Sequence, residues 1–503
     1  MTQIRAYFLL RKSKIFDRQW YLQRYPDVAD SNIDPICHFV LHGFCEGRVP
    51  NQSLEKYIRN GAANAQNISY TKYAEVARIL YQENRGHLKN FDDDLVASGL
   101  KYFEKLPLFN KTDYFDLNQE LMRVPGLNAS KHAFLYGISE GRAIFNKKCV
   151  AKQLGIYSKC VKATQKQSDY VNANRNCFSV VYNETGNLFL MEFAECIAYD
   201  LRDAGHDVAL LTENDDPSKI TENNIIIAPH EFFFLGKWAD VVNNRLLRHS
   251  VVLNTEQPQT LWFERAVPYT MMSRGVIDIS PQVAAIYAAT GFPSVHCDLS
   301  GPEVRDVLPQ DEDAFFRVLP KRAKAIGNRT SRIEDRAIDV SFFGAISEHR
   351  DRFFSKTARF FSDYKCIFYC RRSPLPLTHQ KGVNMLNAAR HVGFHSKIVL
   401  NIHRDEFGFF EWHRMVRLGI ETGAIVVSEP CLAHPYFQPN QHYFEESGRH
   451  IQNLVEWLLR SRDGQDEAET VRHNALELVD QRRGSQSAGR TIANFVCSRT
   501  SKL

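Results

Sequence analysis

The sequence lacks the features that define several classes of protein. Its 503 residues contain no run of 18 apolar residues, so no membrane-spanning helix is predicted, and the first sixteen residues have too short an apolar stretch for a signal peptide. Eleven cysteines are present without a C-x-x-C pair, which favours reduced thiols over disulfides or a structural zinc site. The net charge of +5 is small for this length and disfavours nucleic acid as a partner. We therefore expect a cytoplasmic globular protein.

Two ligand-binding motifs are also missing. The turn after the first predicted strand, residues 183–187, contains a single glycine instead of G-x-G-x-x-G, which disfavours a dinucleotide site. This turn still allows a phosphate or a substrate to approach backbone N–H groups. No D-x-D sequence follows a predicted strand, where metal-dependent sugar transfer would need one. We expect no cofactor and no catalytic metal.

The N-terminal third, residues 1–150, is predicted to be mainly helical and contains an internal repeat. The segment HFVLHGFCEGR, residues 38–48, corresponds to HAFLYGISEGR, residues 132–142. The two copies span residues 16–50 and 109–145, and each predicts two short helices that end at a glycine. A packing unit is the simpler interpretation, in which His38 and His132 are buried. A docking module for a partner or a glycan is the alternative.

Residues 147–176 are polar and rich in lysine, which indicates a linker, assigned to residues 151–176, or an exposed helix. Beyond them strands alternate with helices, which predicts βαβ units and parallel sheets. The first domain is expected at residues 177–300, with strands at residues 176–184, 205–214, 223–233, 251–259 and 275–282. Residues 301–337 are expected to connect it to a second domain at residues 338–503, with strands at residues 340–346, 366–370, 397–403 and 424–429. The predicted fold class is α/β, with two Rossmann-like domains preceded by the helical domain.

Residues 397–430 carry the strongest signal for a ligand site. A buried strand leads into a charged loop at residues 403–406, then an amphipathic helix, a glycine turn and another buried strand. On a regular helix, one arc of roughly 80° holds Glu411, Arg414, Leu418 and Glu421. A separate apolar stripe that can pack on the sheet holds Phe409, Trp412, Val416 and Ile420. A solvated helix face with one ion pair is the simpler interpretation. We favour a ligand-binding helix because the preceding loop is also charged.

This region resembles the donor-binding domain of bacterial GT-B glycosyltransferases, which use nucleotide-activated sugars. The likeness lies in KIVLNIH at residues 397–403, GAIVVSEP at residues 423–430 and IDVSFFGAISEHRDRFF at residues 338–354, and it extends over about residues 177–480. The N-terminal repeats resemble short helical repeats attached to bacterial glycosyltransferases and surface proteins. Many retaining members carry two glutamates eight positions apart at the helix start. Here Glu411 and Glu421 are ten apart, so retention of configuration is not supported.

The ends of the predicted strands supply candidate site residues. In the first domain, an imidazole or carboxylate base for an acceptor hydroxyl would come from His230, Glu231 or Glu256. Local hydrogen bonding and helix capping are the simpler roles. In the second domain, donor-binding candidates are Gly344, Arg350, His403, Arg404, Glu411, Arg414 and Glu421. The arginines would stabilise a departing phosphate, and the resemblance implies that Glu411 or Glu421 accepts hydrogen bonds from a donor ribose. Alternative cations are Arg371 and Arg372.

The sequence and the resemblance together predict a metal-independent glycosyltransferase. It would move a sugar from a nucleotide sugar to a glycan, a lipid-linked acceptor or a protein, in bacterial surface polysaccharide or glycoprotein synthesis. A position peripheral to the inner membrane is compatible with this role, with the N-terminal repeats contacting the membrane or assembly partners. The main alternative is a non-catalytic glycan-binding or scaffold protein on the same fold. Another enzyme of this fold, such as a sugar-nucleotide epimerase, is a third hypothesis.

Overall fold

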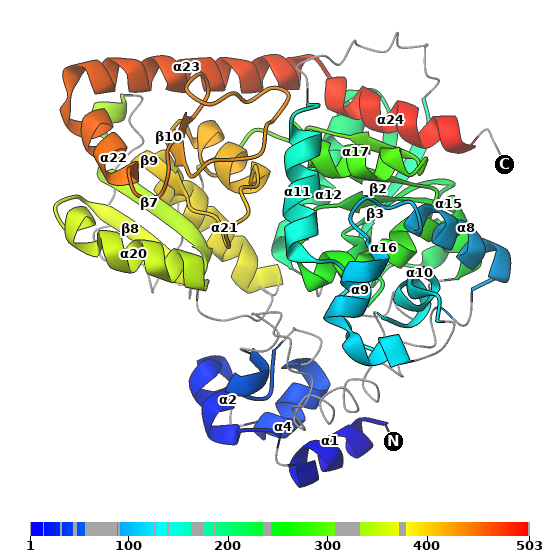
Figure 1. The fold of residues 1–503 in the computed structure, drawn as a ribbon. Helices are drawn as coiled ribbons and strands as arrows, with labels where there is room; N and C mark the ends of the chain where they lie inside the picture. Colours follow the sequence, from blue (N-terminus) through cyan, green and yellow to red (C-terminus); the bar gives the residue numbers. More distant parts are fainter. Residues whose placement is uncertain are drawn as a thin grey trace.

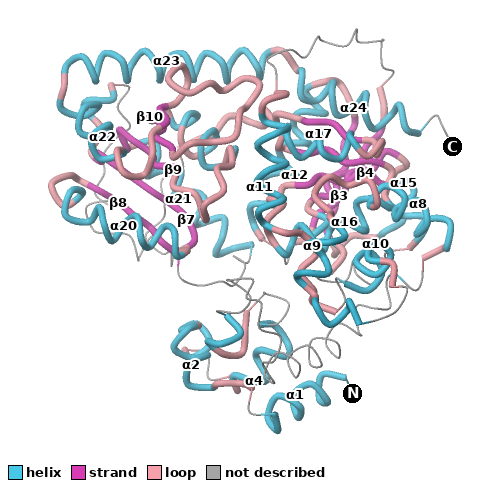
Figure 2. Tube along the Cα trace, in the orientation of Figure 1, coloured by secondary structure: helices cyan, strands magenta, loops and turns pink. Residues whose placement is uncertain are grey.

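The protein has two lobes that are each built on a parallel β-sheet, and a smaller helical lobe made by the N-terminal residues (Figure 1). The computed structural model describes residues 2–13, 15–30, 33–43, 48–55, 88, 91–123, 127–137, 140–161, 175–184, 187–234, 243–306, 332–371 and 379–500. Helices cover both faces of each sheet (Figure 2). None of the described helices is long and apolar enough to cross a lipid bilayer.

The first sheet is parallel, and its six described strands follow the order β2-β1-β3-β4-β5-β6. In chain order these are β1 (Cys177–Tyr182), β2 (Asp207–Thr212), β3 (Asn223–Ile227), β4 (Ser250–Asn254), β5 (Gly275–Asp278) and β6 (Ser294–His296). The strands β3, β4 and β5 are almost wholly buried, as expected for continuous apolar runs covered on both faces. The helices around this sheet are α12 (Leu188–Asp203), η4 (Pro217–Lys219), α13 (Pro229–Phe232), α15 (Asn244–His249), α16 (Leu261–Met272) and α17 (Pro281–Ala289).

The second sheet repeats the same pattern, with the order β11-β10-β9-β7-β8 among its described strands. These are β7 (Ile338–Ala345), β8 (Cys366–Arg371), β9 (Ser396–Asn401), β10 (Ile425–Ser428) and β11 (Phe444–Glu445). The accompanying helices are η5 (Ile333–Asp335), α20 (Glu348–Phe361), α21 (His379–Phe394), η6 (His413–Arg417), η7 (Ile420–Thr422), α22 (Ile451–Arg460) and α23 (Arg462–Gly484). The predicted α/β fold class with two Rossmann-like domains is confirmed.

The last helix departs from the expected division, in which residues 338–503 form a single domain. Helix α24 (Ser487–Thr500) packs against α12 and β3 of the first sheet. The chain therefore crosses between the domains twice, and the two crossings touch where Arg483 Nε donates to the Gly301 carbonyl at 3.2 Å. Backbone N–H groups of Ser300 and Gly301 donate to the Asp200 carboxylate at 3.0 and 2.8 Å. Of the expected connection at residues 301–337, residues 307–331 lie outside the described part.

The two N-terminal copies adopt matching structures. The first contains α2 (Arg18–Arg24), α3 (Pro26–Ala29), α4 (Pro35–His38) and the π-helical turn η1 (Phe39–Gly43). The second contains α9 (Lys111–Leu117), η2 (Gln119–Arg123), α10 (Ala129–His132) and the π-helical turn η3 (Ala133–Gly137). A tyrosine hydroxyl contacts a histidine Nδ1 in each copy, at 3.2 Å between Tyr21 and His38 and at 2.9 Å between Tyr114 and His132. His38 is buried as expected, whereas the His132 side chain keeps 12% of its surface exposed, and each histidine is held by a tyrosine of its own copy.

The copies differ in what they pack against. The first forms a separate apolar cluster with α1 (Thr2–Ser13). The second shares the core of the first sheet together with α8 (Asp93–Phe103) and α11 (Lys147–Ser158). Backbone N–H groups of Ile144 and Phe145 donate to the buried Glu264 carboxylate at 3.2 and 3.0 Å. The stretch predicted to be a linker or an exposed helix begins with α11, which packs on α17. Residues 162–174 lie outside the described part.

We expect a methyl group at Gly43 or Gly137 to destabilise its repeat. A Cβ at Gly43 would collide with the Tyr21 hydroxyl, and one at Gly137 would lie 2.8 Å from the Tyr114 hydroxyl. Each Gly→Ala change should lower the free energy of unfolding by about 1–3 kcal/mol. Gly155→Ala is the matched control, since a Cβ there meets nothing within 4 Å and should stabilise α11 by about 0.5–1 kcal/mol. Thermal unfolding of the three variants measures this, and equal melting temperatures would contradict it.

Candidate active site between the two sheets

Both sheets have a topological switch point, where consecutive connections leave toward opposite sides. It lies between β1 and β3 in the first sheet and between β7 and β9 in the second. Ligands of open α/β sheets bind at the carboxyl ends of the strands at such points. A hydrogen bond joins the two loops at each switch point. Asn187 N donates to Glu231 Oε2 at 2.8 Å in the first domain, and Arg350 Nε donates to the Ile402 carbonyl at 2.9 Å in the second.

Arg350 lies buried beneath the loops that meet at the second-domain switch point. It is buried in the first turn of α20, and its Nη1 also donates to the Ala345 carbonyl at 2.7 Å. Gly344 makes room for this side chain, because a Cβ there would lie 3.1 Å from Arg350 Nη1. Gly344 lies next to the last residue of β7, inside the strand that the sequence predicts at residues 340–346. Burial lowers the pKa of Arg350 to about 9, so the guanidinium stays charged at neutral pH.

Arg414 and Glu411 lie close to Arg350. Arg414 Nη1 donates to Asn401 Oδ1 at 2.8 Å, and Arg414 Nε donates to the Phe343 carbonyl at 3.1 Å. Burial alone would raise the pKa of Glu411, but Arg414, Arg350 and His403 outweigh it and hold that pKa below its ordinary value. Glu411 is therefore an ionised carboxylate in a positively charged surrounding. An ionised Glu411 can accept a hydrogen bond from a hydroxyl group of a ligand.

The three first-domain base candidates lie together, but their surroundings differ. His230 is buried, its Nε2 is 3.7 Å from Glu256 Oε2, and burial lowers its pKa to about 3. Burial raises the pKa of Glu231 to about 7, while its carboxylate accepts the Asn187 N–H at the start of α12. Burial also raises the pKa of Glu256, whose side chain keeps 23% of its surface exposed. Glu231 and Glu256 are both partly exposed, whereas His230 is buried. Glu256 is the better candidate for the base because the Glu231 carboxylate already accepts the Asn187 N–H.

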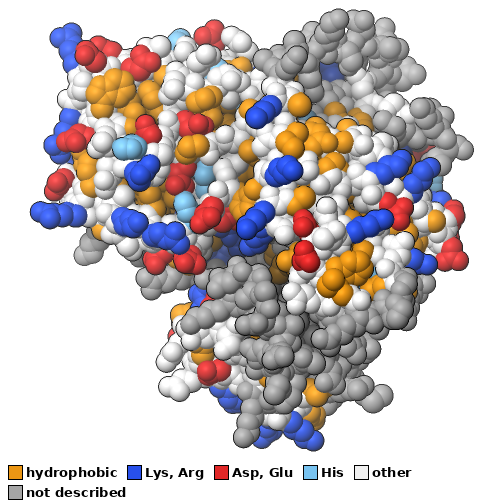
Figure 3. Space-filling model, in the orientation of Figure 1, with side chains coloured by type: hydrophobic (Ala, Val, Ile, Leu, Met, Phe, Trp, Pro, Cys, Tyr) orange, Lys and Arg blue, Asp and Glu red, His pale blue; other side chains and the backbone are white. Residues whose placement is uncertain are grey.

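The two domains contact each other through these loops. Gln257 Nε2 donates to Glu411 Oε1 at 2.8 Å, and Gln259 Nε2 lies 3.4 Å from both carboxylate oxygens of Asp405. Arg404 is exposed, and its charge acts to lower the pKa of Glu256 across the interface. Figure 3 shows basic, acidic and histidine side chains gathered where the two sheet-containing lobes meet. The carboxyl edges of the two sheets therefore face one another.

The predicted helix at residues 409–421 is wrong as a regular α-helix. It contains a π-helical turn, η6, and a 3₁₀ turn, η7, separated by Gly419. A Cβ at Gly419 would collide with the Val426 side chain, so glycine permits this close approach to β10. The apolar stripe also packs differently, since Trp412 faces Phe193 of the first domain with ring centroids 5.4 Å apart. The stripe therefore joins the two domains.

Glu421 lies apart from the other donor-binding candidates. Its carboxylate pairs with Arg417 at 2.5 Å and with Arg483 at 3.1 Å. Burial raises its pKa to about 7. Arg417 continues this network to Glu192 of α12, with 3.2 Å between Arg417 Nε and Glu192 Oε1. Glu421 thus belongs to a buried interdomain network, and the single arc with Glu411 that regular helix geometry suggests is not formed.

Sequence reasoning missed a histidine–carboxylate pair beside the site. His349 Nε2 lies 3.0 Å from both carboxylate oxygens of Glu429, and the hydrogen bond to Glu429 raises the pKa of His349. Glu429 Oε2 also accepts the N–H of buried His403 at 2.9 Å. The signal was present, because each residue follows a strand of the same sheet. Of the alternative cations, Arg371 ends β8 and Arg372 lies outside the described residues.

The topology and the facing strand ends define a GT-B type architecture. No protein-family model matches the chain, and no curated protein matches it. Similar solved structures include T4 phage BGT with UDP-glucose, at 10% identity and a TM-score of 0.38, covering 63% of this chain and 99% of that chain. T4 phage BGT with UDP and Mn²⁺ has 10% identity, a TM-score of 0.39 and the same coverage. Anabaena HepE with UDP has 11% identity and a TM-score of 0.37, covering 66% of this chain and 100% of that chain.

Proposed function

We propose that this protein transfers a glycosyl group from a nucleotide sugar to a hydroxyl acceptor. The observation that supports the proposal is the closeness of two sets of charged groups. Glu256 lies at the strand ends of the first domain, and Arg404 and Glu411 face it from the strand ends of the second. Glycosyl transfer needs these two groups on opposite sides of the reacting carbon. A base must take the acceptor proton, and cations must stabilise the departing phosphate.

The proposed reaction is a single displacement. The Glu256 carboxylate takes the proton of the acceptor hydroxyl, and the acceptor oxygen forms a bond to the anomeric carbon. The bond from that carbon to the phosphate oxygen breaks, and its electron pair leaves with the nucleotide phosphate. Exposed Arg404 and the N-terminal N–H groups of α20 would hold the phosphate. Glu411, fixed by Gln257, would accept a hydrogen bond from the sugar or the ribose.

Arg404→Ala should weaken donor binding with little effect on stability. Arg404 is exposed, so its loss should change the free energy of unfolding by less than about 0.5 kcal/mol. Losing a charge-assisted hydrogen bond to phosphate should cost about 1.5–3 kcal/mol of binding free energy, a decrease of roughly ten- to a hundredfold in affinity. Calorimetric titration with UDP and UDP-glucose as probes measures this.

The control for this prediction is Arg352→Ala, because Arg352 is exposed on α20 and pairs with Glu348 on the same helix. Equal nucleotide affinity of the Arg404 and Arg352 variants would contradict the assignment of Arg404. Arg414 is a poorer probe than the sequence suggests. It is half-buried and bonded to Asn401, so its loss would also destabilise the second domain.

Release of nucleotide from a nucleotide sugar tests the activity itself. We propose metal-independent transfer to a glycan, lipid-linked or protein acceptor in a cytoplasmic or membrane-peripheral setting, so release should depend on an acceptor and persist with EDTA. Loss of release in EDTA, with the fold intact, would overturn the metal-independent mechanism. Saturable glycan binding without any release would instead support the glycan-binding alternative.

A further inference from the structure

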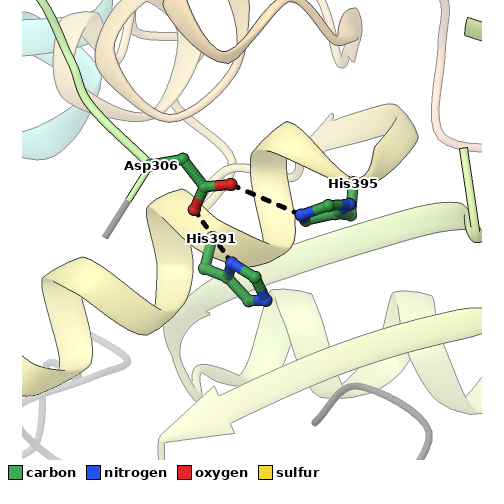
Figure 4. A group of neighbouring side chains, drawn as sticks. All are labelled: Asp306, His391 and His395. Carbon is green, nitrogen blue, oxygen red and sulfur yellow. Dashed lines mark hydrogen bonds and ion pairs between the residues drawn. The ribbon is translucent and has the colours of Figure 1, made fainter. Parts of the chain in front are cut away.

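We propose that Asp306, His391 and His395 form a binding site for a divalent transition-metal ion of the zinc type. The proposed function does not use these residues. His391 lies in the last turn of α21 (His379–Phe394), His395 directly follows that helix, and Asp306 comes from the segment that connects the two domains. Figure 4 shows both rings turned toward the Asp306 carboxylate. One donor atom from each residue can be chosen so that all three lie within 4.8 Å of one another.

The donor atoms are already arranged as a chelating set. His391 Nδ1 lies 2.8 Å from Asp306 Oδ1, and His395 Nε2 lies 3.4 Å from Asp306 Oδ2. The histidine side chains are 1% and 4% exposed, and the Asp306 side chain is 17% exposed. Buried imidazoles cannot swing far from these positions, so a small movement of the carboxylate suffices to admit an ion. The remaining exposure of Asp306 provides a path for the ion.

The donor chemistry selects the class of metal. Two imidazole nitrogens and one carboxylate match the three protein ligands that zinc takes in sites completed by water. Magnesium and calcium prefer all-oxygen sites, so they fit these residues poorly. A dication bound by two neutral imidazoles and one carboxylate leaves a single net positive charge, which a buried site tolerates better than a bare dication.

The location indicates a structural role for the ion. His391 and His395 lie just before β9, which begins at Ser396, so they mark the amino edge of the second sheet. The candidate active site follows the carboxyl end of β9, about 17 Å away along the strand. The other end of the connection attaches nearby, because Arg336 Nη1 donates to the Ser396 carbonyl at 2.7 Å. An ion on Asp306 would therefore fix one end of the connection beside the place where Arg336 fixes the other, and it would stabilise the folded protein by binding only that state.

The test is calorimetric titration of the full chain with Zn²⁺ after treatment with a chelator. We expect one saturable site that Mg²⁺ does not fill, and a melting temperature that rises with Zn²⁺ concentration. Loss of a residue that supports a metal ligand typically costs 10- to 100-fold in affinity, so loss of a ligand in His391→Gln or His395→Gln should cost about 100-fold or more. His473→Gln is the control, because His473 is exposed on α23 and should leave Zn²⁺ binding unchanged.

A second measurement does not depend on variants, which could lose Zn²⁺ binding because they misfold. Anomalous scattering at the zinc edge, from crystals of the unaltered protein grown with Zn²⁺, should place one ion among these three side chains. Zinc bound at cysteine thiolates instead, or affinity that is equal in the His395→Gln and His473→Gln proteins, would overturn the proposal. So would the absence of saturable binding to the unaltered chain.

Discussion

Replacing Glu256 with glutamine should reduce turnover by about 10²–10⁴-fold and leave donor affinity largely intact. Glutamine keeps the size of the side chain but cannot take a proton from the acceptor. Burial raises the pKa of Glu256, so the base is lost to protonation at a higher pH than an ordinary carboxylate. The value of kcat/KM should therefore fall as the pH is lowered through this raised pKa. Steady-state rates of nucleotide release across a pH series measure both effects.

Two controls separate catalysis from structural damage. Glu222→Gln makes the same chemical change at an exposed position before β3, and it should keep full turnover. Glu231→Gln weakens the hydrogen bond that the Asn187 N–H donates at the start of α12. This variant should lose stability, while the turnover of its folded molecules should change little. If the Glu256→Gln protein binds donor and turns over at the rate of the Glu222→Gln protein, Glu256 is not the base.

Replacing Glu192 with alanine should destabilise the protein by about 3–5 kcal/mol, because it leaves buried cations without their partner. The Glu192 carboxylate pairs with Arg390, His413 and Arg417 and is 2% exposed. Burial alone would raise its pKa, but these three side chains hold it far below its ordinary value of 4.5. Its contribution to stability is therefore complete above about pH 4.5 and is lost as the pH falls through the lower folded-state pKa.

Thermal unfolding at neutral pH measures this loss, with Glu195→Ala as the matched control on the same helix. Glu195 is exposed, and its replacement should change stability by less than about 0.5 kcal/mol. The difference between the two variants should shrink at acidic pH, where protonation of Glu192 removes the interaction in the parent protein as well. Equal melting temperatures at neutral pH would show that this network contributes no net stability.

Much of the fold could be predicted from local patterns. Runs such as Ile225–Ile227 and Val251–Leu253 are buried on both faces of a parallel sheet, so their continuous apolar character identifies them as strands. The strands β6 and β11 gave no such signal, because they have three and two residues and are only partly apolar. The segment after Phe409 was predicted wrongly, because its amphipathic spacing fits a regular helix, whereas Gly419 allows the backbone to pack closely against β10.

The sequence could predict which strand ends form the site, but it could not predict which side chains contact one another there. Charged residues after β3, β4, β7 and β9 indicate where a ligand binds, because carboxyl ends of parallel strands share one edge. The pairing of Gln257 with Glu411 joins residues 154 positions apart, and no local pattern indicates it. The role of Glu192 could have been predicted, because it is the only acidic residue in the apolar first turns of α12, and a buried carboxylate needs a charged or hydrogen-bonding partner.

The paired crossings of the chain define how the two domains can move. Both crossing points contain a residue in the left-handed backbone region, Gly301 with φ of 66° and Gln486 with φ of 56°. They lie side by side, joined through Arg483. A body attached at two neighbouring points can swing about the line between them but resists twisting about the long axis of the molecule. We therefore expect any opening of the proposed site to be a rotation about this one line, and such a rotation has to break the Trp412–Phe193 contact and the Arg417–Glu192 ion pair.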